Sequence, residues 1–329
     1  MDQLYQLSLN LTIWLQENYP QFLSLMRLIS LTGEEQFYLV ILPAFYWAIN
    51  KHLGRQLGYL FLFSVAVNNI LKNTFRQPRP FWLDPSVQQA EAEGYGITSG
   101  HVQNATAVLF LLASWVKRGW VWLPAALYVF LMAVSRVYLG VHFIQDVFFG
   151  FWVGLLLLVI FLVLRNRFIA GFNKRILGKR LLGMIALPVI LASTYVAVLL
   201  LLGPPDMTVP WSAYIPAAEL NGYEDIVSGV AGLLGFGIGI VLESSRIRFR
   251  SDGPVWQRIA RYLLGIAVAI AIWGGLRAAF PFELAWIALP FRFLRYFLLL
   301  FWVTYLAPWV FVKLRLATTD PEPEARVTL

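Results

Sequence analysis

Long apolar stretches dominate this chain and limit what it can fold into. Hydrophobic residues make up 59% of the chain and charged residues only 13%, whereas a soluble domain has about a quarter charged residues. A helix needs about 20 mostly apolar residues to cross a bilayer. We therefore predict an all-α integral membrane protein, a polytopic transmembrane helical bundle. The nine predicted spans lie at about 35–50, 56–73, 101–116, 120–138, 143–165, 181–203, 224–243, 260–280 and 286–312.

The two ends of the chain depart from this pattern. Residues 4–31 are apolar but are interrupted between Glu17 and Pro20, which indicates a pair of interfacial helices rather than a clean span. The last residues are acidic, contain proline and lack apolar periodicity, which predicts a disordered tail. We expect four parts in chain order: an N-terminal interfacial segment at 1–34, a first transmembrane bundle at 35–165, a C-terminal extension of about four spans at 166–316, and the tail at 317–329.

Lysine and arginine are distributed unequally between the connections. Counted alternately, the basic connections fall on one side of the membrane. The connection at 204–223 lies on the other side and carries Asp206 and Glu219 but no Lys or Arg. Because basic loops favour the cytoplasm, we expect the C-terminus to be cytoplasmic. Basic cytoplasmic loops also account for the formal charge of +8, so the charge does not call for a nucleic-acid partner.

Three fixed cations stand at the ends of predicted spans. Lys72 and Arg79 flank the end of the second span, and Arg136 ends the fourth. The helix gives way at Pro78 and Pro80, which stand on either side of Arg79. Arginine holds two phosphate oxygens at once and keeps its proton. Because charges placed in a membrane are costly, the three cations indicate a functional site for an anion.

Two histidines and a carboxylate complete the pattern. His142 and Asp146 are four residues apart at the start of the fifth span, a spacing that predicts one shared helix face. The carboxylate would accept the Nδ1 proton and leave Nε2 free to attack phosphorus. His101 follows Ser99 and Gly100 at the start of the third span, where free backbone amides favour an anion. The set predicts hydrolysis of a phosphate ester, with His101 protonating the leaving oxygen.

These three blocks resemble the signature of the type 2 phosphatidic acid phosphatase (PAP2) superfamily, K-x6-RP, P-S-G-H and S-R-x5-H-x3-D. The resemblance covers roughly residues 30–165, and Thr98 stands where the family usually has proline. The blocks read here as Lys72 to Arg79-Pro80, Thr98-Ser99-Gly100-His101, and Ser135-Arg136 with His142 and Asp146.

The resemblance implies a metal-independent phosphatase that uses no cofactor. It implies that His142 is the nucleophile, that His101 is the acid and base, and that Asp146 orients His142. The residues implied to hold phosphate are Lys72, Arg79, Ser99, Gly100 and Arg136. The chain has no cysteine, which independently excludes disulfides and cysteine-based metal or redox chemistry.

Finer resemblances concern the substrate. Residues 33–47 resemble the first span of sphingosine-1-phosphate phosphatases, and Arg79 to Trp82 with the nine-span layout resemble glucose-6-phosphatases. Because a site at helix ends is open sideways to the bilayer, we expect a lipid phosphate or polyprenyl (di)phosphate at the outer leaflet of a plasma or inner membrane. The sequence leaves open a small-molecule phosphatase, a phosphotransferase using the same residues, and a lipid-binding or transport protein.

Overall fold

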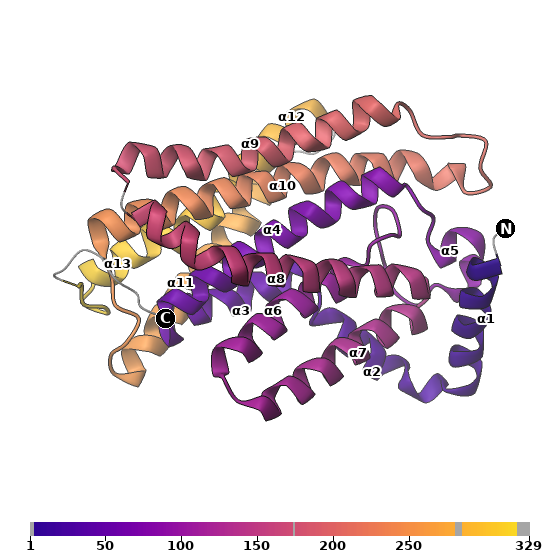
Figure 1. Cartoon of the computed structure of the whole chain (residues 1–329), viewed down its shortest axis with the longest axis horizontal. Helices are drawn as coiled ribbons and strands as arrows, with labels where there is room; N and C mark the ends of the chain where they lie inside the picture. The colour runs from indigo at the N-terminus through magenta and orange to yellow at the C-terminus, as the bar shows by residue number, and fades with distance from the viewer. Residues whose placement is uncertain (1–2, 174, 280–284, 321–329) are drawn as a thin grey trace. The chain divides into compact units, whose positions relative to one another are not determined.

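The computed structural model describes residues 3–173, 175–279 and 285–320, and this part of the chain is helical (Figure 1). Its one β-type pairing is an isolated antiparallel bridge between Phe249 and Thr319. The predicted all-α class is therefore confirmed. The helices are α1 (Gln3–Asn18), α2 (Leu23–Leu31), α3 (Glu35–Ala44), α4 (Lys51–Phe75), α5 (Pro80–Leu83), α6 (Gly100–Val116), α7 (Trp122–Tyr138), α8 (Ile144–Asn173), α9 (Leu177–Leu202), α10 (Ile215–Leu242), α11 (Val255–Ala279), α12 (Ala285–Phe301) and α13 (Ala307–Lys313).

Six helical segments of the described chain are long and apolar enough to cross a membrane, which identifies an integral membrane protein. They coincide with the last six predicted spans and comprise Gly119–Tyr138, Ile144–Asn166, Leu177–Leu202, Ser212–Ile247, Val255–Ala279 and Ile287–Lys313. The first three predicted spans are also helical, in α3, α4 and α6. They are not among the six: α6 has only 17 residues, and α4 carries several charged and amide side chains.

The chain divides into two compact units. Unit 1 comprises Met1–Tyr38, Ser64–Ile160 and Thr194–Asp225. Within it, α6 and α7 pack against each other and are joined by a short turn, and α2 packs along α7 (Figure 1). The N-terminal pair is present as α1 and α2, separated by a 3-10 turn that begins at Pro20. Its interfacial position stays a prediction.

Polar side chains of α1 support the connection between α7 and α8. Thr12 Oγ1 donates a hydrogen bond to Val137 O at 3.1 Å, and Ile144 N donates to Ser8 Oγ at 2.9 Å. The connection also needs a glycine. Gly140 has φ +68, and a β-carbon there would lie 2.1 Å from Val87 O, so any side chain would collide with backbone. These contacts fix the segment that carries His142.

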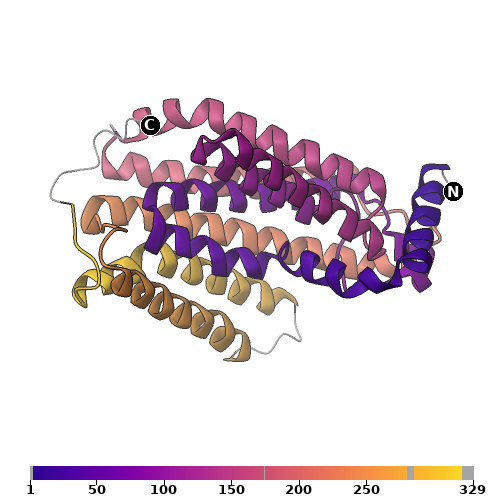
Figure 2. The same ribbon diagram turned by 90° about the horizontal axis from the view of Figure 1, so that it is seen from below.

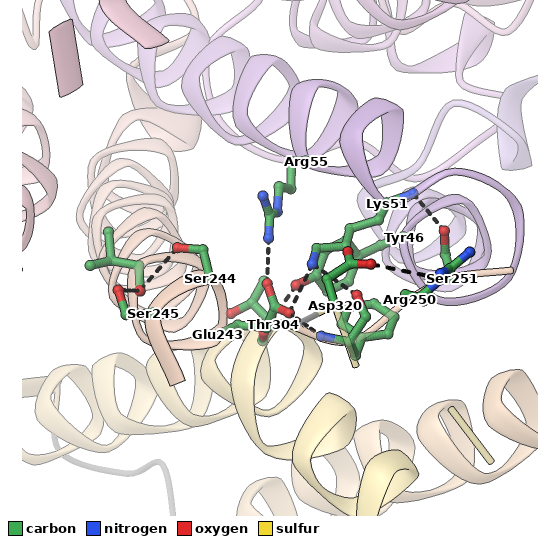
Figure 3. A network of polar contacts seen from close by, with 12 residues as sticks. Tyr46, Lys51, Arg55, Glu243, Ser244, Ser245, Arg250, Ser251, Thr304 and Asp320 are labelled. Carbon is green, nitrogen blue, oxygen red and sulfur yellow. Dashed lines mark hydrogen bonds and ion pairs between the residues drawn. The ribbon is translucent and has the colours of Figure 1, made fainter. Parts of the chain in front are cut away.

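Unit 2 comprises Leu39–Phe63, Phe161–Ser193 and Ile226–Leu329. In this unit α11 packs along α12 (Figure 2). A fully buried carboxylate, Glu243, follows the end of α10 and organises the polar contacts there (Figure 3). Its Oε1 lies 3.0 Å from Lys51 Nζ, and its Oε2 pairs with Arg55. The carboxylate therefore neutralises cations that would otherwise be costly to bury.

The first residues of the predicted disordered tail are paired. Arg250 N donates to Thr318 O at 2.8 Å, and Asp320 N donates to Arg248 O at 2.8 Å. Ala317 is buried. The prediction of disorder is thus wrong for 317–320, because backbone pairing with the segment after α10 replaces the apolar periodicity that the sequence lacks. The rest of the tail, 321–329, lies outside the described residues.

Candidate active site

Arg79 is buried in unit 1 and is held by backbone carbonyls. α4 ends at Phe75, and Pro78 precedes Arg79, which has an extended backbone and is 2% exposed. Its Nε donates to Gly94 O at 2.7 Å, one terminal nitrogen donates to Val141 O at 2.9 Å, and the other to Glu93 O. A guanidinium has five N–H donors, so two are not used by these carbonyls, and one of the two lies on the nitrogen that is nearest His142.

His142 faces this guanidinium and is oriented by Asp146. Its Nε2 lies 3.4 Å from an Arg79 terminal nitrogen, and its Nδ1 lies 3.3 Å from Asp146 Oδ2. Both His142 and Asp146 are almost fully buried. When Nδ1 donates its proton to the carboxylate, the Nε2 lone pair is directed toward Arg79.

The prediction that His142 and Asp146 share a helix face is wrong. α8 begins at Ile144, so His142 lies in the turn before it, where its backbone N–H donates to Arg136 O at 3.3 Å. The two side chains meet because Asp146 reaches back over the first turn of α8. The same Oδ2 accepts a hydrogen bond from Phe143 N at 2.9 Å, as a capping carboxylate does.

The surroundings keep the His142 imidazole neutral. Burial lowers its pKa well below the usual value, and the nearby positive charge of Arg79 lowers the pKa further. Arg136, Lys72 and His101 act electrostatically in the same direction. Of these four residues from the three separated blocks, Arg79 is in contact with His142, and the other three act on it electrostatically. A neutral imidazole is the form that can act as a nucleophile.

Arg136 and Lys72 supply the other predicted cations. Arg136, in the last turn of α7, is buried and donates to Ser30 Oγ, while its Nε has no hydrogen-bond partner in the described chain. Lys72, in the last turn of α4, is half-buried. Because buried cations are costly unless they are neutralised, this pair of side chains with Arg79 favours occupation by an anion.

The start of α6 presents two more polar groups without partners. α6 begins at Gly100, and Ser99 N donates to Asp146 O at 3.0 Å, which joins this helix to α8. Ser99 Oγ and His101 Nε2 are buried and make no hydrogen bond in the described chain. The backbone at Gly33 lies close to the His101 ring. Only a glycine allows this approach, because a β-carbon at Gly33 would lie 2.6 Å from His101 Cδ2. Unpaired buried polar atoms need an explanation, and a bound phosphate provides one.

Thr98 belongs to a buried polar network. Its Oγ1 accepts a hydrogen bond from Asn68 Nδ2 at 2.6 Å and donates to Gln103 Oε1 at 3.1 Å. Gln103 Nε2 in turn donates to Ser64 O at 2.8 Å, and Ser64 Oγ donates to Asn104 Oδ1 at 2.7 Å. The network fixes the segment leading into Ser99.

Several supporting residues are not evident from the signature blocks. Ser30 contacts Arg136, and Asn68 and Gln103 contact Thr98, but all three lie outside the signature blocks. Amide side chains inside apolar helices were the available signal for two of them. The carbonyls of Glu93 and Gly94 carry no sequence signal, since every residue has one. Within the described chain no three His, Asp or Glu side chains group closely enough to hold a metal ion.

The part of the chain that carries these site residues matches a known protein family. Residues 53–170 match the PAP2 superfamily. The chain carries a PAP2 superfamily domain. Residues 227–319 match a second family, described as the transmembrane extension of PAP2 superfamily phosphatases. All the predicted site residues lie inside the PAP2 domain, and the extension covers most of α10 and the helices after it.

Curated proteins are similar to the PAP2 domain. Sphingosine-1-phosphate phosphatase 2 of Homo sapiens is 32% identical over 139 residues, which are 39% of this chain and 34% of that protein. Phosphatidylglycerophosphatase B of Bacillus subtilis is 31% identical over 119 residues, 33% of this chain and 53% of that protein. The chain thus spans about a third to a half of the length of these relatives.

A solved structure is also similar. The crystal structure of a transmembrane PAP2 type phosphatidylglycerolphosphate phosphatase from Bacillus subtilis matches with a TM-score of 0.42 and 24% identity. The match covers 50% of this chain and 85% of that chain.

Proposed function

We propose that this protein is a membrane-embedded phosphatase that hydrolyses a lipid phosphate through a phosphohistidine intermediate. The observation that carries the proposal is the line from Asp146 through His142 to Arg79, with distances of 3.3 Å and 3.4 Å. A binding site for phosphate needs cations, but it needs neither a neutral imidazole nor a carboxylate that orients it.

In the first step His142 Nε2 attacks phosphorus. The N–P bond forms as the ester P–O bond breaks, and His101 gives its proton to the departing oxygen. Arg79, Arg136 and Lys72 hold the non-bridging oxygens, on which negative charge is concentrated. Asp146 stabilises the positive charge that develops on the His142 ring.

In the second step water replaces His142 on phosphorus. His101, now neutral, takes a proton from the water as the new O–P bond forms and the N–P bond breaks. Phosphate leaves, His142 is neutral again, and His101 carries the proton needed for the next turnover. Ser99 Oγ and the backbone at Gly100 serve as further donors to the phosphate oxygens.

The substrate we favour is a phosphorylated amphiphile. The relatives named sphingosine-1-phosphate phosphatase and phosphatidylglycerophosphatase both act, by their names, on lipids with a phosphate monoester. A long-chain base phosphate, a glycerolipid phosphate and a polyprenyl phosphate share this chemistry, and a polyprenyl diphosphate presents a terminal phosphate whose leaving group is a phosphate instead of an alcohol. Each keeps its apolar chain in the bilayer while the phosphate reaches the buried cations.

The orientation and the domain plan are part of the proposal. The active site faces the extracytoplasmic side of a plasma or inner membrane, and the C-terminus is cytoplasmic. Residues 35–165 form the catalytic bundle, and 166–316 form an extension. The basic connections support this orientation, as does the segment 204–223, which carries Asp206 and Glu219 but no Lys or Arg and whose last residues form the start of α10.

Phosphate release by the purified protein tests the proposal. The panel contains phosphatidic acid, a long-chain base phosphate, undecaprenyl diphosphate and glucose 6-phosphate, each with excess chelator. We expect release from a lipid substrate by the wild type, no loss with chelator, and loss of at least about a thousandfold in His142→Ala. His52→Ala, which changes the histidine at the other end of α4 in unit 2, is the matched control and should retain activity.

The intermediate has its own test. Brief reaction with a lipid substrate labelled in the phosphate should label the wild type with an acid-labile, alkali-stable phosphoryl group. The label should be absent from His142→Ala. Full activity of His142→Ala would refute the mechanism.

The other functions left open by the sequence are outcomes of the same assay. Faster turnover of glucose 6-phosphate than of any lipid would support a small-molecule phosphatase. Transfer of label to an added alcohol in preference to water would support a phosphotransferase. Binding of lipid phosphate without release or labelling would support a lipid-binding or transport protein.

A further inference from the structure

The first turns of α10 contact the loop that holds Arg79. This part of α10, residues 215–225, belongs to unit 1 together with that loop. It lies between the two regions that match known families, 53–170 and 227–319, so neither family description covers it. The contacts that it makes are polar and converge on residues 93–95.

Two side chains of α10 make these contacts. Glu219 Oε1 accepts a hydrogen bond from the Tyr95 hydroxyl at 2.7 Å and lies 3.3 Å from Arg76 Nε. Asn221 Nδ2 donates to Glu93 Oε2 at 2.9 Å. Tyr95 is 1% exposed and Asn221 is 9% exposed. Glu93 is exposed and Glu219 is half-buried, but the buried side chains of Tyr95 and Asn221 are costly to leave without a partner.

Glycines allow the backbones to approach at the same place. Gly94 has φ +69, and a β-carbon there would lie 2.6 Å from Asn221 Oδ1. On the other side, a β-carbon at Gly222 would lie 2.3 Å from Asn73 Oδ1, and Asn69 Nδ2 donates to Gly222 O at 3.2 Å. α10 therefore fits closely against both the loop and the last turns of α4.

The loop in turn holds the Arg79 guanidinium. Glu93 O and Gly94 O accept two of the hydrogen bonds that fix it. A shift of residues 93–95 would therefore turn the guanidinium away from His142. Asp225, one turn further along α10, acts electrostatically on both Lys72 and Arg79. The same helix thus reaches the supports of two predicted phosphate-binding cations.

We propose that Glu219 and Asn221 are positioning residues for the phosphate site. They hold residues 93–95 so that the Arg79 donors not bonded to carbonyls stay directed at the side of the guanidinium that faces His142, where the phosphate would bind. The inference rests on the proposed function, since it assigns Arg79 to phosphate binding. It extends the functional site beyond the PAP2 domain, to a helix that leads into the transmembrane extension.

An exchange of partners tests the inference. Asn221→Asp places a carboxylate against the carboxylate of Glu93 and should repel the loop. We expect kcat/KM for the lipid phosphate to fall about tenfold, the effect of losing one charged hydrogen bond. The inhibition constant for orthovanadate, which resembles the five-coordinate phosphoryl group, should rise by a similar factor.

The double variant Asn221→Asp/Glu93→Gln restores a donor and an acceptor in reversed order. It should recover activity and vanadate affinity to within about threefold of the wild type. Tyr95→Phe removes the donor to Glu219 and should weaken both quantities in the same direction. Asn18→Asp makes the same chemical change at an exposed position of α1 and should have no effect.

The vanadate measurement separates this inference from the proposed function. Its binding is followed by the rise in thermal midpoint, which needs no turnover. If the wild type binds vanadate but releases no phosphate, the proposed function fails. The vanadate affinity of the variants still tests whether Glu219 and Asn221 position the phosphate site. Unchanged vanadate affinity in Asn221→Asp, or a double variant as weak as the single one, would overturn the inference. A loss confined to lipid substrates with normal vanadate affinity would also overturn it, because that pattern indicates lipid recognition.

Discussion

The contact between Asp146 and His142 allows a quantitative test of the mechanism by Asp146→Asn. Asparagine has almost the same shape, and its oxygen can still accept from Phe143 N, so the turn should keep its geometry. The negative charge opposite His142 Nδ1 is lost. Both side chains are at most 2% exposed, so solvent does not screen the change.

The size of the expected loss in kcat follows from the distance between Asp146 and His142. At 3.3 Å, a full charge pair interacts by about 5 kcal/mol at an effective dielectric constant of about 20. A charged hydrogen bond contributes about 1.5–3 kcal/mol by mutational measurement. The ring gains only part of a charge in the transition state, so we expect a loss of about 3–4 kcal/mol, or a kcat lower by about 10²–10³.

The assay is steady-state phosphate release from the preferred lipid in mixed micelles. KM should change by less than about threefold, because other residues hold the phosphate. Asp206→Asn is the matched control, since Asp206 is exposed and bonds only locally to Thr208 among the contacts described. A kcat for Asp146→Asn within threefold of the wild type would refute the role of the carboxylate.

Three further results are expected. Arg79→Lys loses the fork that bonds to backbone carbonyls and phosphate together, so kcat/KM should fall at least about a hundredfold and orthovanadate inhibition should weaken. Burial and nearby cations lower the pKa of His142, so its imidazole stays neutral at pH values below the usual histidine pKa of about 6.5. The acid limb of the kcat/KM profile, which reports the free enzyme, should therefore lie below that pH. An acid limb above it would contradict the assignment of His142 as the nucleophile. Glu243→Gln leaves two buried cations in unit 2 without their carboxylate and should destabilise the protein by about 3–5 kcal/mol, seen as a lower thermal midpoint, whereas Asp252→Asn in an exposed pair should change the midpoint little.

The spacing of residues in the sequence predicted which side chains meet, but not how they meet. The fixed spacing of the signature residues was enough to predict that His142, Asp146 and Arg79 lie close together. The signature blocks stand at the ends or starts of helices of unit 1. The helix-face argument for His142 failed, since the side chain of Asp146 caps the first turn of α8 and so moves the helix start to Ile144.

The supports of the site were harder to predict because they depend on the backbone or on distant segments. Three carbonyl groups hold Arg79, and a carbonyl is common to every residue. Ser30 and Asn221 come from helices far away in the chain. Their polar character alone did not distinguish them from residues at an interface.

Thr98 shows how a departure from the family signature can be built into the surrounding fold. A proline at this position would keep the backbone carbonyl that accepts from Asn68, but its ring could neither accept from Asn68 nor donate to Gln103, whereas the threonine hydroxyl does both. The two amides lie in α4 and α6, where an unpaired polar group would be costly. They are therefore best understood together with Thr98, as one buried network that holds the segment entering Ser99. In this chain, hydrogen bonds constrain the turn that we propose binds phosphate, at the position where the family usually has proline.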